Sequence, residues 1–185
     1  MNQRSDARRN REGLLRAADE VFAAETVDAP LQRVAERAGV GRGTLYRHFP
    51  DRYALAAALY EERLARYEAL ATAHHDETDV LLILLRAVTQ EQSRIPGLFR
   101  LIFADEAGRR YLEALWSRST ELFTAPLATS QSAGAVRSDL TVDDVLMVVG
   151  MVYGVVNSPA GLLGPAAVRR ALDLVVHGLT PPAEH

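Results

Sequence analysis

Residues 35–49 carry the densest set of side chains able to contact nucleic acid, in the order AERAGVGRGTLYRHF. Small Ala35 permits two short helices to approach closely, and Gly39 suits a left-handed turn between them. Val40 and Leu45 supply apolar contacts that fill the gap between the helices. The outer face is left with hydrogen-bond donors, small residues and one aromatic hydroxyl, namely Arg42, Gly43, Thr44, Tyr46, Arg47 and His48. Such a set at a helix N-terminus is typical of a helix that contacts base edges and phosphates in the major groove.

The composition is that of a folded protein. The chain has 185 residues, of which 48% are hydrophobic, so it can bury a full core. It contains no cysteine, which excludes disulfides, thiolate nucleophiles and cysteine zinc sites. The polar N-terminus lacks a signal segment, and the longest apolar run, residues 145–156, is shorter than the roughly 20 residues that span a bilayer. We therefore expect a soluble, cytoplasmic protein without a membrane partner.

The charge is distributed unevenly along the chain. The net charge of the whole chain is −3, which is unusual for a protein that binds DNA. Residues 1–52, however, hold ten arginines against eight acidic residues, whereas residues 53–185 hold eleven arginines against sixteen acidic residues. The excess of positive charge therefore coincides with the pair of short helices.

Apolar residues recur with helical spacing along nearly the whole chain, and no segment alternates as a strand would. We expect an all-α fold with three short helices, over residues 7–25, from residue 30, and over residues 41–48. Longer helices are expected from residue 52 and over residues 80–90, 98–103, 109–129, 141–157 and 165–177. The expected domains are an N-terminal three-helix, helix-turn-helix domain (1–52) and a C-terminal helical bundle (53–185).

The run VAERAGVGRGTLYRHF, residues 34–49, resembles the DNA-binding domain of TetR-family transcriptional regulators, and the resemblance extends over residues 14–55. It implies that the N-terminal domain binds DNA and that the C-terminal bundle binds a ligand and dimerises. Two positions depart from the family pattern. Thr26 stands where many members have glycine after the first helix, and Pro30 stands where many have threonine at the start of the second. We therefore do not expect the phosphate contact of that threonine here.

The resemblance also implies roles for matching residues. Arg42 is expected to read a base, because arginine can bind guanine through two hydrogen bonds. Gly43 is expected to let the backbone approach the groove, and Thr44 to touch a base or a thymine methyl group. Arg47 is expected either to read a base or to neutralise charge. The expected phosphate contacts are Tyr46, His48 and Arg52.

Two of these assignments have structural alternatives. Tyr46 and His48 can instead pack against the first and fourth helices. The arginines before the first helix can reach the DNA backbone or minor groove as a flexible arm, or can simply keep the N-terminus soluble. These arginines are Arg4, Arg8, Arg9 and Arg11.

Aromatic and methionine residues of the C-terminal part are candidates for the lining of a ligand pocket. An apolar cavity with a few polar groups suits a small apolar or amphipathic effector, with Arg86, Arg100 or Asn157 as polar contacts. The alternative is that these side chains form the ordinary core of a bundle. The candidates are Tyr60, Tyr67, Phe99, Phe103, Tyr111, Trp116, Met147 and Met151.

The last two helices are candidates for a homodimer interface. Gly150 and Gly154 lie four residues apart on one helical face and permit close approach of another helix. Two such helices from each subunit would form a four-helix interface, as the resemblance also implies. A symmetric DNA site needs two DNA-contacting helices, one from each subunit, which favours the dimer over packing within one chain. The apolar positions of the last helix are Val168, Ala171, Leu172, Val175, Val176 and Leu179.

Metal, cofactor and catalytic sites are not expected. The cluster His74-His75-Asp76-Glu77, with Asp79 nearby, falls where two helices join. Adjacent histidines on a helix point about 100° apart, so a solvated connector is the better interpretation. The acidic pair Asp143-Asp144 is explained by helix capping. The chain has no glycine-rich phosphate loop, nucleophile elbow or paired histidine motif, so we do not expect an enzyme.

These observations favour a homodimeric, sequence-specific transcriptional regulator that binds double-stranded DNA at a pseudo-palindromic operator. Release of a repressor by an effector is the preferred mechanism. An activator, or a regulator of the same fold controlled by a protein partner, is one alternative. A helical carrier or enzyme without DNA binding is another.

Overall fold

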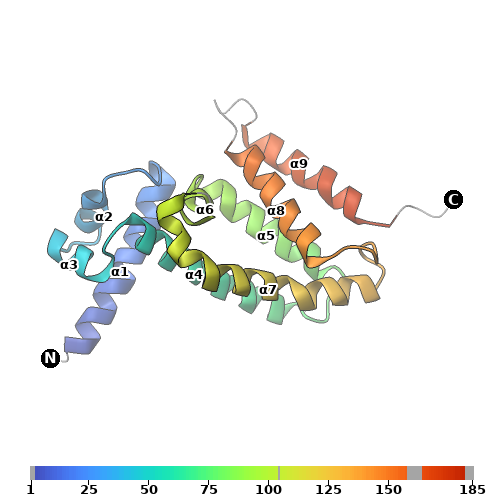
Figure 1. Ribbon diagram of the computed structural model, residues 1–185, viewed down its shortest axis with the longest axis horizontal. Helices are drawn as coiled ribbons and strands as arrows, with labels where there is room; N and C mark the ends of the chain where they lie inside the picture. Colours follow the sequence, from blue (N-terminus) through green and yellow to red (C-terminus); the bar gives the residue numbers. More distant parts are fainter. Residues whose placement is uncertain (1–2, 104, 158–163, 182–185) are drawn as a thin grey trace. The chain divides into compact units, whose positions relative to one another are not determined.

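The computed structural model describes residues 3–103, 105–157 and 164–181 (Figure 1). Within these residues the chain forms nine α-helices and one 3-10 helix and no β-strand, which confirms the expected all-α fold. None of the described helices is long and apolar enough to cross a membrane. In chain order the elements are α1 (Gln3–Ala24), α2 (Leu31–Arg37), α3 (Arg42–His48), α4 (Arg52–Ala73), α5 (Val80–Arg94), α6 (Leu98–Phe103), η1 (Glu106–Tyr111), α7 (Leu112–Ser132), α8 (Val142–Val156) and α9 (Gly164–Leu179).

The chain divides into two compact units. Unit 1 comprises Met1–Glu62 and Ile95–Glu113, and unit 2 comprises Arg63–Arg94 and Ala114–His185. This grouping differs from the expected division after residue 52, because α6 and η1 pack with the N-terminal part of the chain. Periodicity in a sequence identifies helices but does not reveal which distant helices they contact.

Unit 1 is built around the apolar stripes of its first three helices. α1 starts at Gln3 rather than at residue 7, because charge pairs at helical spacing extend it: Arg9 pairs with Asp6, and Arg8 with Glu12. The buried side chains include Leu14, Leu15, Ala18 and Phe22 of α1, Leu31, Val34 and Ala35 of α2, and Leu45 of α3. The short helices α2 and α3 are therefore held by packing rather than by their own length.

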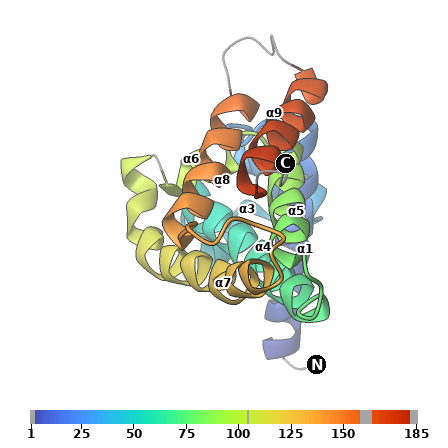
Figure 2. The ribbon, with the colours of Figure 1, turned by 90° about the vertical axis from the view of Figure 1, so that its right-hand side faces the viewer.

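In unit 2, one broad side of α5 is buried in the core. Arg86 and Gln90 on the opposite side of the helix are exposed. α8 and α9 lie side by side, and both contact α5 (Figures 1 and 2). The fully buried Ser130 of α7 accepts a hydrogen bond from the Leu81 backbone N–H (3.2 Å), which satisfies an amide in the first turn of α5.

The start of α8 confirms the capping interpretation of the acidic pair. Thr141 Oγ1 accepts a hydrogen bond from the Asp144 backbone N–H (3.2 Å), and the Thr141 N–H donates to Asp144 Oδ2 (2.8 Å). The Thr141 hydroxyl and backbone lower the pKa of Asp144 through these hydrogen bonds. The carboxylate is therefore a structural cap.

Gly108 allows η1 to fold tightly against α6. A Cβ atom at this position would lie 1.9 Å from the Leu101 carbonyl oxygen, a distance that no packed pair of atoms can adopt. The Gly108 N–H donates to the Asp105 carbonyl (3.0 Å), which closes the turn between the two elements. Only glycine fits here without a shift of the backbone.

We predict that Gly108→Ala lowers the free energy of unfolding by about 1–3 kcal/mol, because the backbone of η1 must move away from α6. The matched control is Gly13→Ala in α1, where the nearest atom to a new Cβ is 4.0 Å away at the end of Arg16. That variant should gain about 0.5–1 kcal/mol from helix propensity. Urea denaturation measures both values, and equal stabilities of the two variants would contradict the tight contact.

Candidate nucleic-acid interface

The turn between α2 and α3 has the geometry that the sequence predicted. Gly39 adopts a φ of +68°, in the left-handed region that favours glycine. The Gly39 N–H donates to the Glu36 carbonyl (3.1 Å), and the Val40 N–H donates to the Ala35 carbonyl (3.0 Å). These bonds close the end of α2 and set the direction in which α3 begins.

α3 has one buried side and one free side. Leu45 is 1% exposed and anchors the helix in unit 1. On the opposite side Arg42, Gly43 and Arg47 are exposed, and Tyr46 is 43% exposed, whereas the expected contact residue Thr44 is half-buried. The Arg42 guanidinium lies 5.9 Å from the centre of the Tyr46 ring. The structure thus places the Arg42 guanidinium, the Tyr46 hydroxyl and the exposed backbone of Gly43 on the same side of α3.

Gly43 has no role inside the chain that requires glycine. A Cβ atom built at this position would meet nothing within 4 Å, and the residue lies in regular helix. A residue that costs helix stability without relieving any internal contact is typical of a surface approached by another molecule.

His48 sits at the edge of this surface, and its ring is half-buried beside Phe49. Its Nε2 atom is buried without a hydrogen-bond partner among the described residues. Burial lowers the pKa of His48, and the nearby positive charges of Arg47 and Arg11 lower it further, so the ring is neutral near pH 7. The geometry agrees with the packing alternative for this residue, and the phosphate contact stays a prediction.

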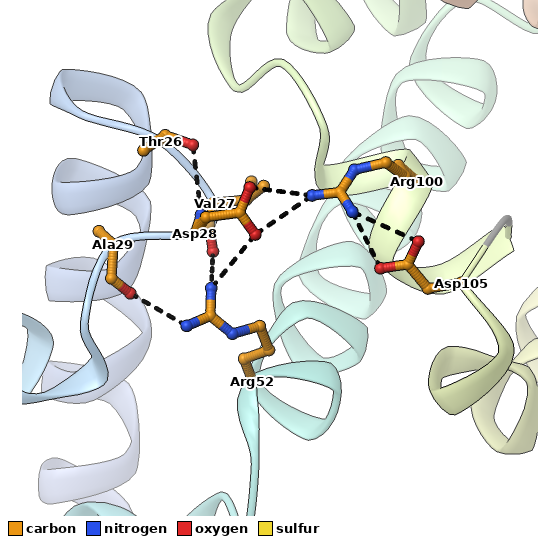
Figure 3. Close-up of polar contacts among 7 residues, drawn as sticks. All are labelled: Thr26, Val27, Asp28, Ala29, Arg52, Arg100 and Asp105. Atoms are coloured by element: carbon orange, nitrogen blue, oxygen red, sulfur yellow. Dashed lines mark hydrogen bonds and ion pairs between the residues drawn. The ribbon is translucent and has the colours of Figure 1, made fainter.

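Arg52 is engaged with the loop between α1 and α2 (Figure 3). Its Nη1 atom donates to the Val27 carbonyl (2.6 Å) and lies 3.5 Å from the Asp28 carboxylate, while Nη2 donates to the Ala29 carbonyl (3.4 Å). Thr26 Oγ1 accepts a hydrogen bond from the Asp28 N–H (3.2 Å) in the same loop. The side chain that was expected at a phosphate thus holds the loop that precedes α2. A contact to loop carbonyls 23–25 residues away leaves no signal in the sequence.

The N-terminal arginines do not form a flexible arm where the structure describes them. Arg8, Arg9 and Arg11 lie within α1, because the helix begins at Gln3. Arg8 and Arg9 are exposed and pair with acidic residues of the same helix, and the Arg11 guanidinium lies 5.4 Å from the centre of the Phe49 ring. The side chain of Arg4 lies outside the described residues. The expectation of an arm is therefore corrected to a helical face.

The eight candidates for a ligand pocket do not form one described site. In unit 1 the Phe103 ring stacks on Phe99 (4.1 Å between centres) and meets Tyr60 edge-on (5.3 Å). Met147 and Met151 of α8 are 60% and 50% exposed. The remaining candidates differ in exposure: Tyr67 is buried, Tyr111 is half-buried and Trp116 is exposed.

A cavity of about 440 Å³ lies in unit 2, and none of the eight candidates is among its lining residues. It is formed by the C-terminal half of α4, the connector that follows it, the start of α5 and the second half of α7. Its apolar lining includes Ala71, Val80, Leu122, Ala125 and Pro126, and its polar lining includes Glu68, Thr72, His75 and Thr129. Glu68 accepts hydrogen bonds from Arg118 (2.9–3.1 Å) at this site. The one sequence signal was Pro126, a proline inside a helix.

The histidine-rich connector between α4 and α5 forms turns. His74 lies 3.7 Å from Glu77, and His75 lies 3.1 Å from Asp76. In the part of the chain that the structure describes, no three His, Cys, Asp or Glu side chains are placed to hold a metal ion.

Comparison with known proteins extends over both units. Residues 14–59 match the family model of bacterial regulatory proteins of the tetR family. Residues 76–181 match the model of the C-terminal domain of SbtR-like transcriptional regulators. An HTH-type transcriptional regulator of Staphylococcus aureus (strain USA300) is 27% identical over 125 residues, which cover 65% of this chain and 66% of that protein. The match thus spans slightly less than two thirds of that relative.

Solved structures cover nearly the whole chain. A TetR transcriptional regulator from Streptomyces coelicolor is 31% identical, with a TM-score of 0.68 and coverage of 94% of this chain and 99% of that chain. The TetR transcription regulatory protein from Mycobacterium vanbaalenii is 26% identical, with a TM-score of 0.66 and coverage of 97% and 100%. These matches confirm the resemblance of residues 34–49 and extend it beyond the helix-turn-helix. The chain therefore belongs to the TetR family of DNA-binding transcriptional regulators.

Proposed function

We propose that this chain is a repressor that binds a pseudo-palindromic operator as a homodimer and leaves it when a small molecule binds the C-terminal bundle. In this proposal residues 1–52 form the DNA-binding domain, and residues 53–185 form the regulatory and dimerisation domain. The protein acts in the cytoplasm, where bacterial DNA lies. The free side of α3 is the observation that carries the proposal.

The exposed side of α3 carries side chains that suit contacts with base edges and phosphates in the major groove. Arg42 is free at the first turn of α3, where a guanidinium can donate two hydrogen bonds to guanine. Gly43 leaves the backbone open to close approach, and Thr44 lies beside it for a base or a thymine methyl. The exposed Tyr46 and Arg47 supply donors for phosphates or a further base.

The contacts at the border of this surface divide into two kinds. Arg8, Arg9 and Arg11 present a positive helical face of α1, which favours phosphate contacts over entry of an arm into the minor groove. Arg52 and His48 act mainly through the fold, Arg52 by holding the loop before α2 and His48 by packing. A phosphate contact of either residue is then secondary.

A homodimer through α8 and α9 is supported by a free apolar stripe on α8. Met147, Gly150, Met151 and Gly154 are all exposed and occupy positions i, i+3, i+4 and i+7 of this helix. Neither glycine has a neighbour within 4 Å of an added Cβ atom, so a second helix can approach closely. Leu174 of α9 is also exposed. Two such chains would present two copies of α3 to half-sites about 34–36 Å apart.

The cavity of unit 2 supports control by a small molecule. A volume of about 440 Å³ with a mainly apolar lining and a few polar groups suits an amphipathic effector. Such an effector lowers DNA affinity only if it binds the non-binding conformation more tightly. The aromatic and methionine candidates do not form one described site, so the cavity of unit 2 is the preferred effector site, and ligand screening with the purified chain tests it. A promoter fusion distinguishes a repressor from an activator or from a regulator controlled by a protein.

We predict that Arg42→Ala weakens operator binding by about 1–3 kcal/mol and relaxes the preference at one base pair. The operator is first selected by the parent chain from a random-sequence DNA library, and affinity is then measured by fluorescence anisotropy. The matched control is Arg86→Ala, which removes one positive charge from an exposed position of α5. If Arg42→Ala binds as tightly and as selectively as the parent, the base-reading role is wrong.

We predict that Met151→Glu converts the dimer to a monomer, because a charge would be buried in the apolar stripe of α8. Light scattering after size-exclusion chromatography measures the mass directly. Ala69→Glu adds the same charge to an exposed position of α4 and should leave the dimer intact. A Met151→Glu variant that remains dimeric would place the interface elsewhere.

We predict that folding becomes less stable as the pH falls from 7.5 to 5.5, and that His48→Gln reduces this loss. The folded-state pKa of His48 is lowered, so the unfolded chain takes up a proton first as the pH falls. The contribution of neutral His48 to the free energy of unfolding is therefore fully present above the ordinary histidine pKa of about 6.5. It is lost as the pH falls through the pKa that His48 has in the folded chain. Urea denaturation at both pH values measures the effect, with the exposed His177→Gln as control. An unchanged pH dependence in His48→Gln would contradict a buried, neutral ring.

A further inference from the structure

Two acidic residues bracket the helix-turn-helix of unit 1, and each receives an arginine from the same distant segment. Asp28 precedes α2 by three residues, and Asp51 follows α3 by three residues. Arg100 of α6 pairs with Asp28, and Arg110 of η1 pairs with Asp51. The partners of the first pair are 72 residues apart in the chain and those of the second pair are 59 residues apart.

The Asp28 contact is part of a bridge between two elements (Figure 3). Arg100 Nη2 donates to both carboxylate oxygens of Asp28 (3.1 and 3.2 Å), and Nη1 donates to both oxygens of Asp105 (3.0 and 3.3 Å). Arg52 approaches Asp28 from the start of α4 (3.5 Å). The planar guanidinium of Arg100 therefore joins the loop before α2 to Asp105 at the start of the turn into η1, which the point charge of a lysine would not do.

The Asp51 contact joins η1 to the start of α4. Asp51 Oδ1 accepts a hydrogen bond from the Ala54 N–H (2.9 Å) and so caps α4. Its second oxygen, Oδ2, accepts a hydrogen bond from Arg110. One carboxylate thus fixes both the beginning of α4 and the position of η1.

The two arginines lie on one segment whose parts contact each other. Gly108 presses η1 against the Leu101 carbonyl, and the Asp105 N–H donates to the Arg100 carbonyl (3.0 Å). Apolar contacts attach the same segment to the rest of unit 1. Gly97 adopts a φ of +86°, and a Cβ atom there would lie 2.9 Å from the side chain of Val27. Arg100 and Arg110 therefore act on the helix-turn-helix together.

We infer that residues 95–103 and 105–113 form a clamp that holds α2 and α3 in the orientation for DNA binding, with Arg100 and Arg110 as its positioning residues. This inference rests on the proposed function of α3. Neither arginine is needed at the DNA, because each acts on an acidic residue at one end of the helix-turn-helix. The chain enters the clamp from α5 and leaves it into α7.

The exposure of the two ion pairs determines how much their loss changes the stability of the chain. All four side chains are at least partly exposed, and exposed ion pairs contribute little to global stability. Loss of the clamp should therefore leave the chain folded. It should loosen α2 and α3, because helices of seven residues depend on their surroundings for their orientation.

The test compares Arg100→Gln, Arg110→Gln and the double variant with the parent chain. Hydrogen exchange of residues 26–49 is measured without DNA, and affinity is measured by anisotropy on the duplex that the parent selects. We expect faster exchange in residues 26–49 and, for the double variant, a loss of affinity of about three- to tenfold. Arg137→Gln is the matched control, because Arg137 makes a similar exposed, two-point contact with Asp139 in unit 2.

A double-mutant cycle separates the ion pair from a general effect of lost charge. Asp51→Asn removes the charge and keeps an oxygen that can cap α4, so Asp51→Asn with Arg110→Gln should loosen residues 26–49 no more than either change alone. Additive effects would overturn the pairing. Unchanged exchange, or faster exchange without loss of affinity, would overturn the clamp. If the parent itself selects no DNA, the proposed function fails, whereas the exchange comparison still decides the clamp.

Discussion

A helix of seven residues is too short to be stable alone in water, so α3 keeps its shape and direction only through its neighbours. Its single buried residue, Leu45, anchors it in unit 1, and the left-handed Gly39 sets where it begins. Buried Phe49 fixes the chain where it ends. The side chains proposed to contact DNA lie mostly on this short helix. Their spacing and direction therefore depend on how firmly the surrounding residues hold it.

Arginine side chains make many of the contacts that hold these elements in place. The chain has no lysine, and its 21 lysine-or-arginine positions are all arginine. A planar guanidinium can bind two acceptors at once, and the structure uses this property repeatedly. Arg52 donates to two loop carbonyls, Arg100 bridges two carboxylates, and Arg118 binds Glu68 through two nitrogen atoms. The same chemistry on the free side of α3 is available to a base or a phosphate. What distinguishes Arg42 from these structural arginines is that its guanidinium faces solvent and the ring of Tyr46.

Local signals predicted the helices, the turn and the acidic cap of α8. The Gly39 turn and the Asp144 cap both depend on residues within a few positions of one another, which a sequence displays directly. The loop carbonyls bound by Arg52 and the Asp28 carboxylate bound by Arg100 lie 23–72 residues away, and neither periodicity nor composition carries that information. The cavity of unit 2 was missed for the same reason, since it arises where three helices meet. The exposure of Met147 and Met151 also depends on which face of α8 packs inward.

The most direct test of the central claim is binding of the purified chain to the DNA upstream of its own gene, measured by fluorescence anisotropy over a series of salt concentrations. We expect saturable binding with a dissociation constant of about 10⁻⁸ M or lower at physiological salt. Binding should exceed that of random duplex by at least about 10³-fold and should weaken steeply as salt rises. Weak binding to both duplexes, followed by failure to enrich any sequence from a random library, would contradict a sequence-specific regulator.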